Sequence, residues 1–248
     1  MTRVAVGGYR GKVGAILVAA LQSEPGVDYA GGLGRGDDAR GFFERAKPQA
    51  YVDFTRPAEA LANVLAAVAA GAAPVVGTTG LTAEAVADIE RACRAGGLGG
   101  IVAPNFAIGA VLMMHLAEIA APYFDAAEVI ELHHAAKLDA PSGTALATAR
   151  RLAAARKQKP FAHPKPEKET LAGTRGGEEG NVAVHSVRLP GLVADQEVIF
   201  GLPGQTLTVT HRTTSREAYV PGVLLAIRAV ASGPKFYRSL DQLLGLGG

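Results

Sequence analysis

The residues best able to do chemistry are concentrated in one short segment of the chain. Residues 131–145, ELHHAAKLDAPSGTA, hold two adjacent histidines, a lysine and a Pro-Ser-Gly-Thr turn. Residues 128–132 are typical of a strand, and Ser142 is a suitable N-cap for a helix that we expect to run to Lys157. The free N–H groups at such a helix end bind carboxylates or phosphates. Together with the charge of Lys137, they predict a site for an anionic small molecule.

Strand geometry separates the two histidines. Successive side chains of a strand point to opposite faces, so His133 and His134 face opposite ways if the strand continues that far. Only one of them then lies on the same face as Glu131. The alternative interpretation is that both histidines are partly buried polar residues and that Pro-Ser-Gly is ordinary helix-start chemistry.

Composition limits the class of protein. The chain has 248 residues, of which 48% are hydrophobic and 19% charged, and this balance is typical of a globular protein. A net charge of +2 without a long basic run argues against a nucleic-acid partner. No apolar segment reaches the length of about 18 residues that a membrane span needs, and the N-terminus lacks a signal-peptide pattern. The single cysteine, Cys93, excludes an internal disulfide, and we expect it to be a buried residue of a cytoplasmic protein.

A glycine-rich turn follows the first predicted strand, residues 3–6. Its glycines have the spacing G-x-x-G-x-x-G, at Gly8, Gly11 and Gly14. An amphipathic helix begins at Val13, so the turn would bring backbone N–H groups close to a pyrophosphate. Arg10 and Lys12 add positive charge that a purely structural turn does not need. The segment therefore predicts a dinucleotide phosphate site.

The second predicted strand, residues 28–33, bears on the choice of cofactor. Dinucleotide-binding folds commonly carry an acid just after this strand to bind the ribose 2′-OH, but here the position is Gly34, followed by Arg35. An arginine suits the additional phosphate of NADPH, so we expect NADPH, with NADH as a second cofactor because Asp37 can turn in. The alternative is that Arg35 is a solvated turn residue.

Strand and helix patterns alternate through the first hundred residues. Strands are predicted at 50–54, 74–76 and 101–103, with helices at 57–71 and 83–95. This alternation predicts a parallel sheet with helices on both faces, in which ligands bind beyond the carboxyl ends of the strands. The residues expected at those ends are Phe54, Thr55, Arg56, Gly77, Thr78, Thr79, Ala103, Pro104, Asn105 and Phe106. For any one of them taken singly, ordinary turn chemistry is the alternative.

The alternation stops after Ala107. We expect a helix at 107–121, then, beyond the segment described first, a long loop at 158–180 that forms a lid or an assembly arm. Strand patterns follow at 181–189, 197–200 and 206–213, the last two joined by a hairpin. They predict an open, mainly antiparallel sheet, which homo-oligomerisation would cover, and a helix at 216–231 that returns to the first domain. No metal site is expected, because no partner lies at ligand spacing from the other histidines, His115, His163, His185 and His211.

At full length, the residues resemble one known family. Residues 131–145 closely resemble the active-site signature of dihydrodipicolinate reductase, whereas residues 6–14, 52–56, 76–80 and 103–109 resemble its cofactor loop, two further cofactor contacts and its hinge. The resemblance implies a Rossmann-type dinucleotide domain made of 1–106 and 217–248. It also implies an α+β substrate-binding and oligomerisation domain, 107–216, that forms homotetramers. The sequence departs from many relatives at Gly34, where they carry an acid.

The resemblance also implies an activity. It is the NAD(P)H-dependent reduction of 4-hydroxy-tetrahydrodipicolinate (dihydrodipicolinate) in lysine and diaminopimelate biosynthesis, with His133 as the general acid and Lys137 stabilising developing charge. The expected substrate-binding residues are His134, Lys137, Ser142, Gly143, Thr144 and Thr79. The expected cofactor contacts near the N-terminus are Gly8, Arg10, Gly11, Lys12, Val13, Gly14 and Arg35. Two alternatives stay open, an imine-reducing amino-acid dehydrogenase and a non-catalytic protein that senses NAD(P)H.

Overall fold

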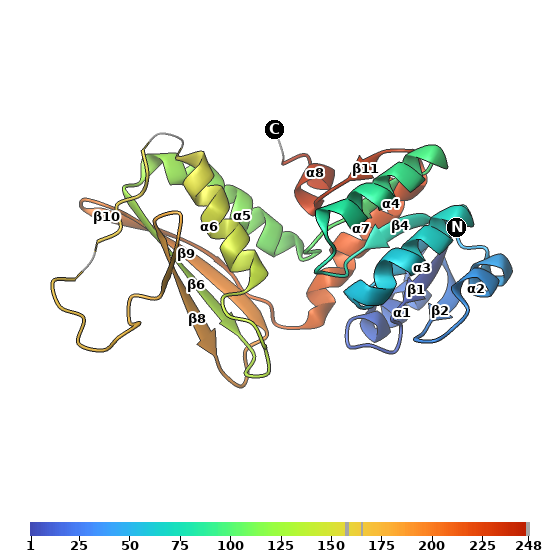
Figure 1. Cartoon of the computed structure of the whole chain (residues 1–248), viewed down its shortest axis with the longest axis horizontal. Coiled ribbons are helices and arrows are strands. Elements are labelled where there is room, and N and C mark those ends of the chain that lie inside the picture. The colour runs from blue at the N-terminus through green and yellow to red at the C-terminus, as the bar shows by residue number, and fades with distance from the viewer. Residues whose placement is uncertain (157–158, 165, 247–248) are drawn as a thin grey trace. The chain divides into compact units, whose positions relative to one another are not determined.

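The computed structural model describes residues 1–156, 159–164 and 166–246. The chain divides into two compact units, one made of Met1–Ile108 and Arg216–Gly248 and the other of Gly109–Ser215 (Figure 1). The first unit is therefore built from both ends of the chain, and the second is one continuous segment. Among the described residues, no helix combines the length and the apolar character needed to span a membrane.

The first unit is built on a six-stranded sheet in the order β11-β5-β4-β3-β1-β2. Its strands are β1 (Thr2–Gly7), β2 (Val27–Leu33), β3 (Ala50–Asp53), β4 (Ala73–Val76), β5 (Gly100–Val102) and β11 (Phe236–Tyr237). Every neighbouring pair is parallel, which confirms the predicted sheet. The chain passes from β1 outward to β2 and then returns to place β3 on the other side of β1. The sheet therefore changes direction between β1 and β3, where such folds bind ligands.

Helices pack on this sheet in two groups. The helices and short 3-10 turn of the unit are α1 (Gly14–Ser23), α2 (Ala39–Ala46), α3 (Pro57–Ala69), α4 (Ala83–Ala95), η2 (Arg216–Tyr219), α7 (Val220–Ser232) and α8 (Leu240–Leu244). Helix α3 contacts α2 and α4, whereas α1 contacts α7. Between them, all residues of β3 and β4 are buried, as expected of strands covered on both faces. The predicted helix starts are confirmed: Pro57 opens α3, and the Thr82 hydroxyl accepts a hydrogen bond from the N–H of Ala85 at the start of α4.

Three parts of this unit were not predicted. Helix α2 has only eight residues, and its short apolar stripe around Phe43 lies between glycine and charged residues. Strand β11 has two residues and gains its place by pairing with β5, not from a pattern of its own. Helix α8 has five residues. All three elements are too short for hydrophobic periodicity to reveal them.

The second unit contains a five-stranded sheet in the order β10-β9-β6-β8-β7. Its strands are β6 (Ala126–His133), β7 (Gly177–Glu179), β8 (Val182–Arg188), β9 (Ala194–Leu202) and β10 (Gln205–His211). Its helices are α5 (Ile108–Ala120), the 3-10 turn η1 (Ala121–Tyr123) and α6 (Gly143–Ala155). Side chains of α5, α6 and one face of the sheet, among them Val129, Leu152 and Phe200, form the core of this unit.

The open sheet is confirmed, but its strands are not all antiparallel. Strands β6 and β8 run parallel, because α6 lies between them in sequence and brings the chain back to the start of β6. The expectation of one long loop at 158–180 was also wrong in part, because β7 lies inside this range and pairs with β8. Lys157, the predicted helix end, and residues 158 and 165 of the predicted loop lie outside the described residues.

One face of this sheet carries side chains that point away from α5 and α6. Strand alternation and register place Ile130, Leu132, Val187 and Ile199 on this face. All four are partly exposed. We call these four residues the open face. They lie beside the charged or polar side chains of Glu128, His185 and Glu197, which the same register places on this face, in a sheet whose other face is already packed.

Candidate functional site

The turn after β1 is tightly folded. The N–H of Gly8 donates to the carbonyl of Leu33 at 3.0 Å, and the carbonyl of Gly8 accepts from the N–H of Gly11 at 2.8 Å. Gly8 has a φ of +74°, and a Cβ on Gly14 would lie 2.2 Å from the Gly8 oxygen. Glycine is therefore required at Gly8 and Gly14, and it lets α1 begin directly at the sheet edge.

The start of α1 has the chemistry of an anion site. No side chain caps this helix, whose N-cap is Val13, and its first turn holds no acid. Arg10 and Lys12, in the turn, are exposed. Because a helix start without a side-chain cap, the helix dipole and two cations all favour negative charge, the turn suits the phosphates of a dinucleotide.

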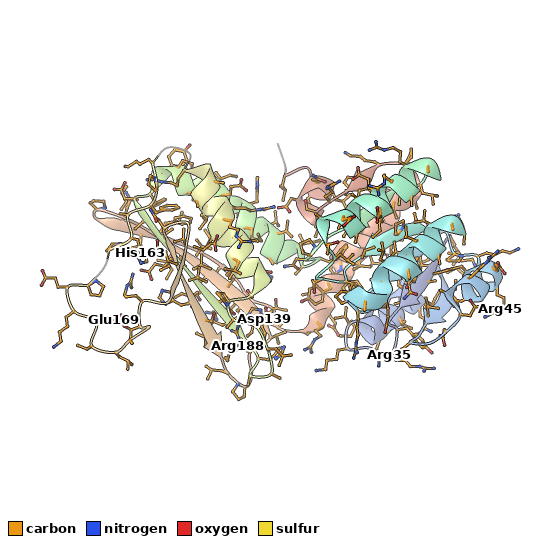
Figure 2. The ribbon with its side chains drawn as sticks, viewed as in Figure 1. Arg35, Arg45, Asp139, His163, Glu169 and Arg188 are labelled. Atoms are coloured by element: carbon orange, nitrogen blue, oxygen red, sulfur yellow. The ribbon has the colours of Figure 1, made fainter. Side chains whose placement is uncertain are left out.

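The end of β2 carries a carboxylate as well as an arginine. Asp37 accepts a hydrogen bond from the N–H of Gly34 through its Oδ2 at 2.7 Å. The side chain of Arg35 is 63% exposed, and its Nε lies 3.5 Å from a carboxylate oxygen of Glu59 (Figure 2). Asp37 therefore stands beside the position where the sequence lacks an acid.

A buried carboxylate that sequence reasoning did not single out lies at the end of β3. Asp53 accepts hydrogen bonds from the Tyr51 hydroxyl at 2.8 Å, the Thr78 hydroxyl at 2.6 Å, and both the N–H and the hydroxyl of Thr55 at 3.1 and 2.8 Å. Its exposed fraction is 0%. Burial raises the pKa of the Tyr51 hydroxyl, and the charge of Asp53 raises it further. The Thr55 and Thr78 hydroxyl protons are therefore engaged by Asp53.

The other predicted cofactor residues divide by exposure. Thr79, Arg56 and Pro104 are exposed at the ends of their strands, and Asn105 is half-buried. Phe106 is 1% exposed and packs against the Phe54 ring, with centroids 5.9 Å apart. The remaining two are Ala103, which is buried, and Gly77, where a Cβ would lie 2.2 Å from the Phe54 ring. Phe106 and Ala103 thus serve the core, and the exposed residues are the ones available to a ligand.

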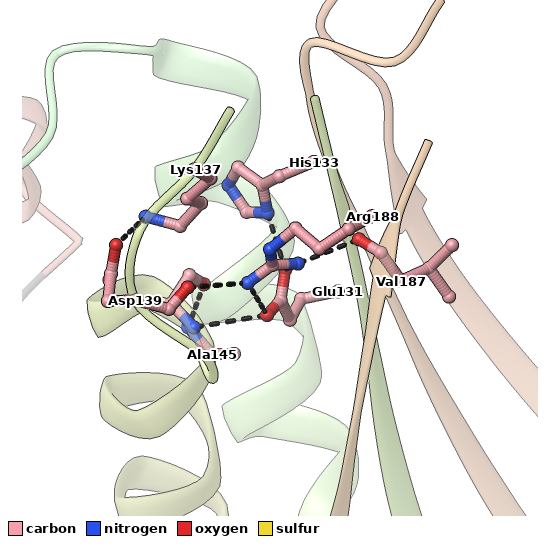
Figure 3. Close-up of polar contacts among 8 residues, drawn as sticks. Glu131, His133, Lys137, Asp139, Ala145, Val187 and Arg188 are labelled. Carbon is pink, nitrogen blue, oxygen red and sulfur yellow. Dashed lines mark hydrogen bonds and ion pairs between the residues drawn. The ribbon is translucent and has the colours of Figure 1, made fainter. Parts of the chain in front are cut away.

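The histidine segment forms a compact polar cluster in the second unit. Strand β6 ends at His133, and the Nδ1 of His133 lies 2.5 Å from Oε2 of Glu131, two residues earlier on the same strand face (Figure 3). The Glu131 side chain has no exposed surface, and that of His133 is 14% exposed. His134 follows the strand and is half-buried. His133 is therefore the histidine that lies on the face of Glu131.

Arg188 completes this cluster. It lies at the end of β8, beside His133 in the parallel register. Its Nη1 and Nη2 donate to the two carboxylate oxygens of Glu131 at 2.8 and 2.7 Å, a bidentate pair (Figure 3). Its Nη2 also donates to the carbonyl of Asp139 at 2.7 Å. Sequence reasoning missed Arg188, because its partner lies 57 residues away. The signal was available only as the alternation of β8, which puts Arg188 on the same face as buried Val184.

The loop after β6 contains the residues that the sequence predicts to bind an anionic group. The Ser142 hydroxyl accepts from the N–H of Ala145 at 3.1 Å, which confirms the N-cap of α6. Gly143 is exposed, and a Cβ built on it would meet nothing within 4 Å, while Thr144 is half-buried. Lys137 is already paired, since its Nζ lies 2.8 Å from Oδ1 of Asp139. A ligand carboxylate at this helix end would therefore compete with Asp139 for the lysine.

The charges of this cluster oppose one another at His133. Burial lowers the pKa of His133, whereas the hydrogen bond and the charge of Glu131 raise it and the cations Lys137 and Arg188 lower it further; the net pKa is lowered. Burial alone would raise the pKa of Glu131, but hydrogen bonds led by that of Arg188 hold it below its usual range. Glu131 is thus an ionised carboxylate in a buried position. Among the residues the structure describes, no group of three acids, histidines or cysteines is arranged to hold a metal ion.

Two family matches together cover nearly the whole chain. Residues 2–106 match the family described as dihydrodipicolinate reductase, N-terminus, and residues 109–244 match dihydrodipicolinate reductase, C-terminus. The chain belongs to the dihydrodipicolinate reductase family. This confirms the resemblance drawn from residues 131–145 and identifies the first unit with the nucleotide-binding part of a dihydrodipicolinate reductase.

Several dihydrodipicolinate reductases are similar along the whole chain. The 4-hydroxy-tetrahydrodipicolinate reductase of Moorella thermoacetica is 49% identical over 93% of this chain and 88% of its own length. That of Mycolicibacterium smegmatis is 45% identical over 98% of this chain and 99% of its own. The dipicolinate-bound dihydrodipicolinate reductase from Paenisporosarcina sp. TG-14 superposes with a TM-score of 0.87 at 37% identity, covering 98% of this chain and 99% of its own. An amine dehydrogenase from Mycobacterium smegmatis, with a TM-score of 0.67 at 14% identity, shares the fold alone.

Proposed function

We propose that this protein reduces 4-hydroxy-tetrahydrodipicolinate to tetrahydrodipicolinate with a reduced nicotinamide cofactor, in the biosynthesis of diaminopimelate and lysine. The observation that carries the proposal is the cluster at the end of β6, where His133 is hydrogen-bonded to a buried carboxylate in a chain of this family. We place the reaction in the cytoplasm, because a single buried thiol, Cys93, suits a reducing compartment.

The cofactor would be held at the carboxyl edge of the first sheet. The glycine turn and the uncapped start of α1 bind its phosphates, with Arg10 and Lys12 supplying charge. When bound, the reduced nicotinamide supplies a hydride. We propose that both NADPH and NADH are used, with NADPH preferred. Arg35 can leave Glu59, a pair only at 3.5 Å and largely exposed, to bind a 2′-phosphate, and Asp37 can accept from a 2′-OH.

The substrate is a dicarboxylate, and the loop after β6 suits one of its carboxylates. Lys137 donates to that carboxylate in place of Asp139, whose exposed side chain returns to water. The N–H groups of Gly143 and Thr144 lie in the first turn of α6, where helix N–H groups lack partners within the helix. His134 and Ser142 border the same loop.

Proton transfer is assigned to His133. Loss of the 4-hydroxyl group as water leaves dihydrodipicolinate, which takes up one hydride and one proton. An imidazole holds and releases a proton near neutral pH, and the lowered pKa of His133 makes it a stronger acid than a free histidine. Lys137 offsets negative charge that develops on the ring.

We further propose that four copies of the chain assemble through the open face. The apolar side chains of Ile130, Leu132, Val187 and Ile199 lie beside Glu128, His185 and Glu197 on an unclosed sheet, and a second copy of the same sheet can cover them. Analytical ultracentrifugation should give the mass of a tetramer, and Ile199→Glu should dissociate it. A monomeric wild-type protein at micromolar concentration would contradict this assembly.

One assay tests the proposed activity. The substrate is made in place by condensing pyruvate with aspartate semialdehyde, and the oxidation of NADPH is followed at its absorbance. His133→Ala should lower kcat by about 10²–10⁴-fold and leave the affinity for NADPH unchanged, which is the range for loss of a general acid. Lys137→Ala should weaken inhibition by dipicolinate. No oxidation by the wild-type protein would refute the activity, and an unchanged kcat in His133→Ala would refute the role of His133.

A further inference from the structure

Glu131 is held more firmly than a surface carboxylate. Its side chain has no exposed surface, and both oxygens are engaged: Oε1 accepts from Arg188 at 2.7 Å and from the N–H of Ser142 at 3.2 Å, and Oε2 accepts from Arg188 at 2.8 Å. Oε2 also lies 2.5 Å from Nδ1 of His133. Because the carboxylate is ionised, His133 must be the donor in this last contact, with its proton on Nδ1.

Arg188 has little capacity left to bind a ligand. Four of its five N–H donors are used, two by Glu131, one by the carbonyl of Val187 at 2.7 Å and one by the carbonyl of Asp139 at 2.7 Å. Its Nε is buried and has no hydrogen-bond partner among the described residues. The contact with Asp139 also fixes the loop that carries Lys137 (Figure 3). These contacts indicate a residue that positions others.

We propose that Glu131 and Arg188 are positioning residues for proton donation by His133. Glu131 accepts the hydrogen bond from Nδ1–H, so when His133 is protonated on both nitrogens it gives the Nε2 proton to the substrate and keeps the one on Nδ1. Arg188 holds Glu131 ionised and in place. The inference rests on the proposed function for the identity of the proton donor, but the hydrogen-bond network itself can be measured without the reaction.

The charges around His133 predict opposite effects for two neutral substitutions. The charged groups facing it from the packed elements are Glu131 on β6, Lys137 in the loop with Asp139 beyond it, and Arg188 on β8. Glu131→Gln removes the charge that raises the pKa of His133, so the histidine should titrate at lower pH. Arg188→Gln removes a charge that lowers it, so the histidine should titrate at higher pH. A residue that only supports the fold would not shift the titration in a direction set by its charge.

The experiment is a histidine titration by NMR on the full-length protein. The ring Cε1–H signals of the six histidines are followed from pH 5 to about 9, and His133→Asn assigns the signal of His133. Arg188→Lys keeps the charge and loses the bidentate pair, so His133 in this variant should titrate at a pH close to that in the wild-type protein. Glu128→Gln is the matched control, because Glu128 lies on the same strand as Glu131 and pairs with His185 and Arg175 instead; it should leave the titration of His133 unchanged.

Kinetics provide the second measurement. Glu131→Gln and Arg188→Gln should each lower kcat by about 10²-fold, the effect of a misplaced reacting group, with smaller changes in KM. The pH at which kcat declines should move with the titration of His133, downward in Glu131→Gln and upward in Arg188→Gln.

Two results would overturn the inference. The first is a His133 titration that shifts in the same direction in both Gln variants or stays unchanged, and the second is an Arg188→Lys titration that matches Arg188→Gln. If the opposite shifts are found in a protein that does not oxidise NADPH, the network stands and the proposed function fails. If the wild-type enzyme is active but the shifts are absent, the network fails alone.

Discussion

Replacing Asp53 should separate the value of its hydrogen bonds from the value of its charge. In Asp53→Ala, the Tyr51 hydroxyl loses its acceptor and the Thr78 hydroxyl keeps only the backbone carbonyl of residue 53, at 3.4 Å, while both side chains stay buried, at 0% and 7% exposed. An unsatisfied buried donor costs about 1–3 kcal/mol and a weakly bonded one costs less, so the free energy of unfolding should fall by about 2–4 kcal/mol. The N–H and hydroxyl of Thr55 are partly exposed and can turn to water, and we assign them no further cost.

Asp53→Asn is the matched control for this substitution. The asparagine oxygen can still accept from Thr55 and Thr78, and its NH₂ group can donate to Tyr51, because a phenol hydroxyl both donates and accepts. The proton of the Tyr51 hydroxyl then lacks an acceptor, so the loss should be about 1–2 kcal/mol, less than in Asp53→Ala. Tyr51→Phe leaves Oδ2 of Asp53 without its donor, and its loss of stability should lie between those of Asp53→Ala and Asp53→Asn.

Urea unfolding followed by circular dichroism measures these differences, and amide hydrogen exchange of peptides covering β3 and β4 localises them to the first unit. The KM for NADPH should rise in Asp53→Ala, because Thr55 and Thr78 are expected beside the cofactor. Equal losses of stability in the Ala and Asn variants would refute the reasoning, since the negative charge and not the acceptor atoms would then be what the fold requires.

Three further predictions concern single groups. Arg35→Ala should raise the KM for NADPH more than that for NADH, and Asp37→Ala should do the reverse; equal effects on both cofactors would exclude contact with the ribose 2′ position. Hydrogen bonds outweigh the effect of burial and lower the pKa of Glu131 in the folded protein. The ionised Glu131 therefore contributes its full stabilisation above the ordinary glutamate pKa of about 4.3, and this stabilisation is lost as the pH falls through the lowered pKa of the folded state. Glu131→Gln should therefore weaken the acid dependence of unfolding, and an unaltered dependence would contradict this. Burial, with the nearby charge of Glu90, raises the pKa of the Cys93 thiol to about 11, so iodoacetamide at pH 8 should modify it more than about 100-fold more slowly than a free cysteine until the first unit unfolds; rapid labelling of the native protein would show that the thiol is accessible.

The parts of the fold that the sequence predicts are those set by local rules. The glycines of the first turn, Pro57, Thr82 and Ser142 act within a few residues of their own position, and each is found where its chemistry requires. Alternation along a strand was enough to put His133 and Glu131 on one face, because a strand has a period of two.

The parts that could not be predicted depend on contacts between distant segments. Arg188 lies 57 residues from Glu131, and their pairing follows from the parallel register of β6 and β8, which the sequence pattern did not indicate. The same holds for Asp53 and Thr78, which are 25 residues apart and meet only because β3 and β4 are neighbours. For Lys137 the segment was correct, but its pairing with Asp139 was missed, since two residues in a loop have no fixed relative direction.

The order in which the two units can fold during synthesis follows from the way the first unit is assembled. The edge strand of its sheet, β11, begins only at Phe236. Helix α7, which packs on the same sheet, begins at Val220. The second unit, by contrast, is continuous and ends at Ser215. During translation the second unit can therefore complete its own hydrogen bonds while the first still lacks one border of its sheet. A chain that is truncated before Phe236 would therefore contain a folded second unit and an incomplete first unit.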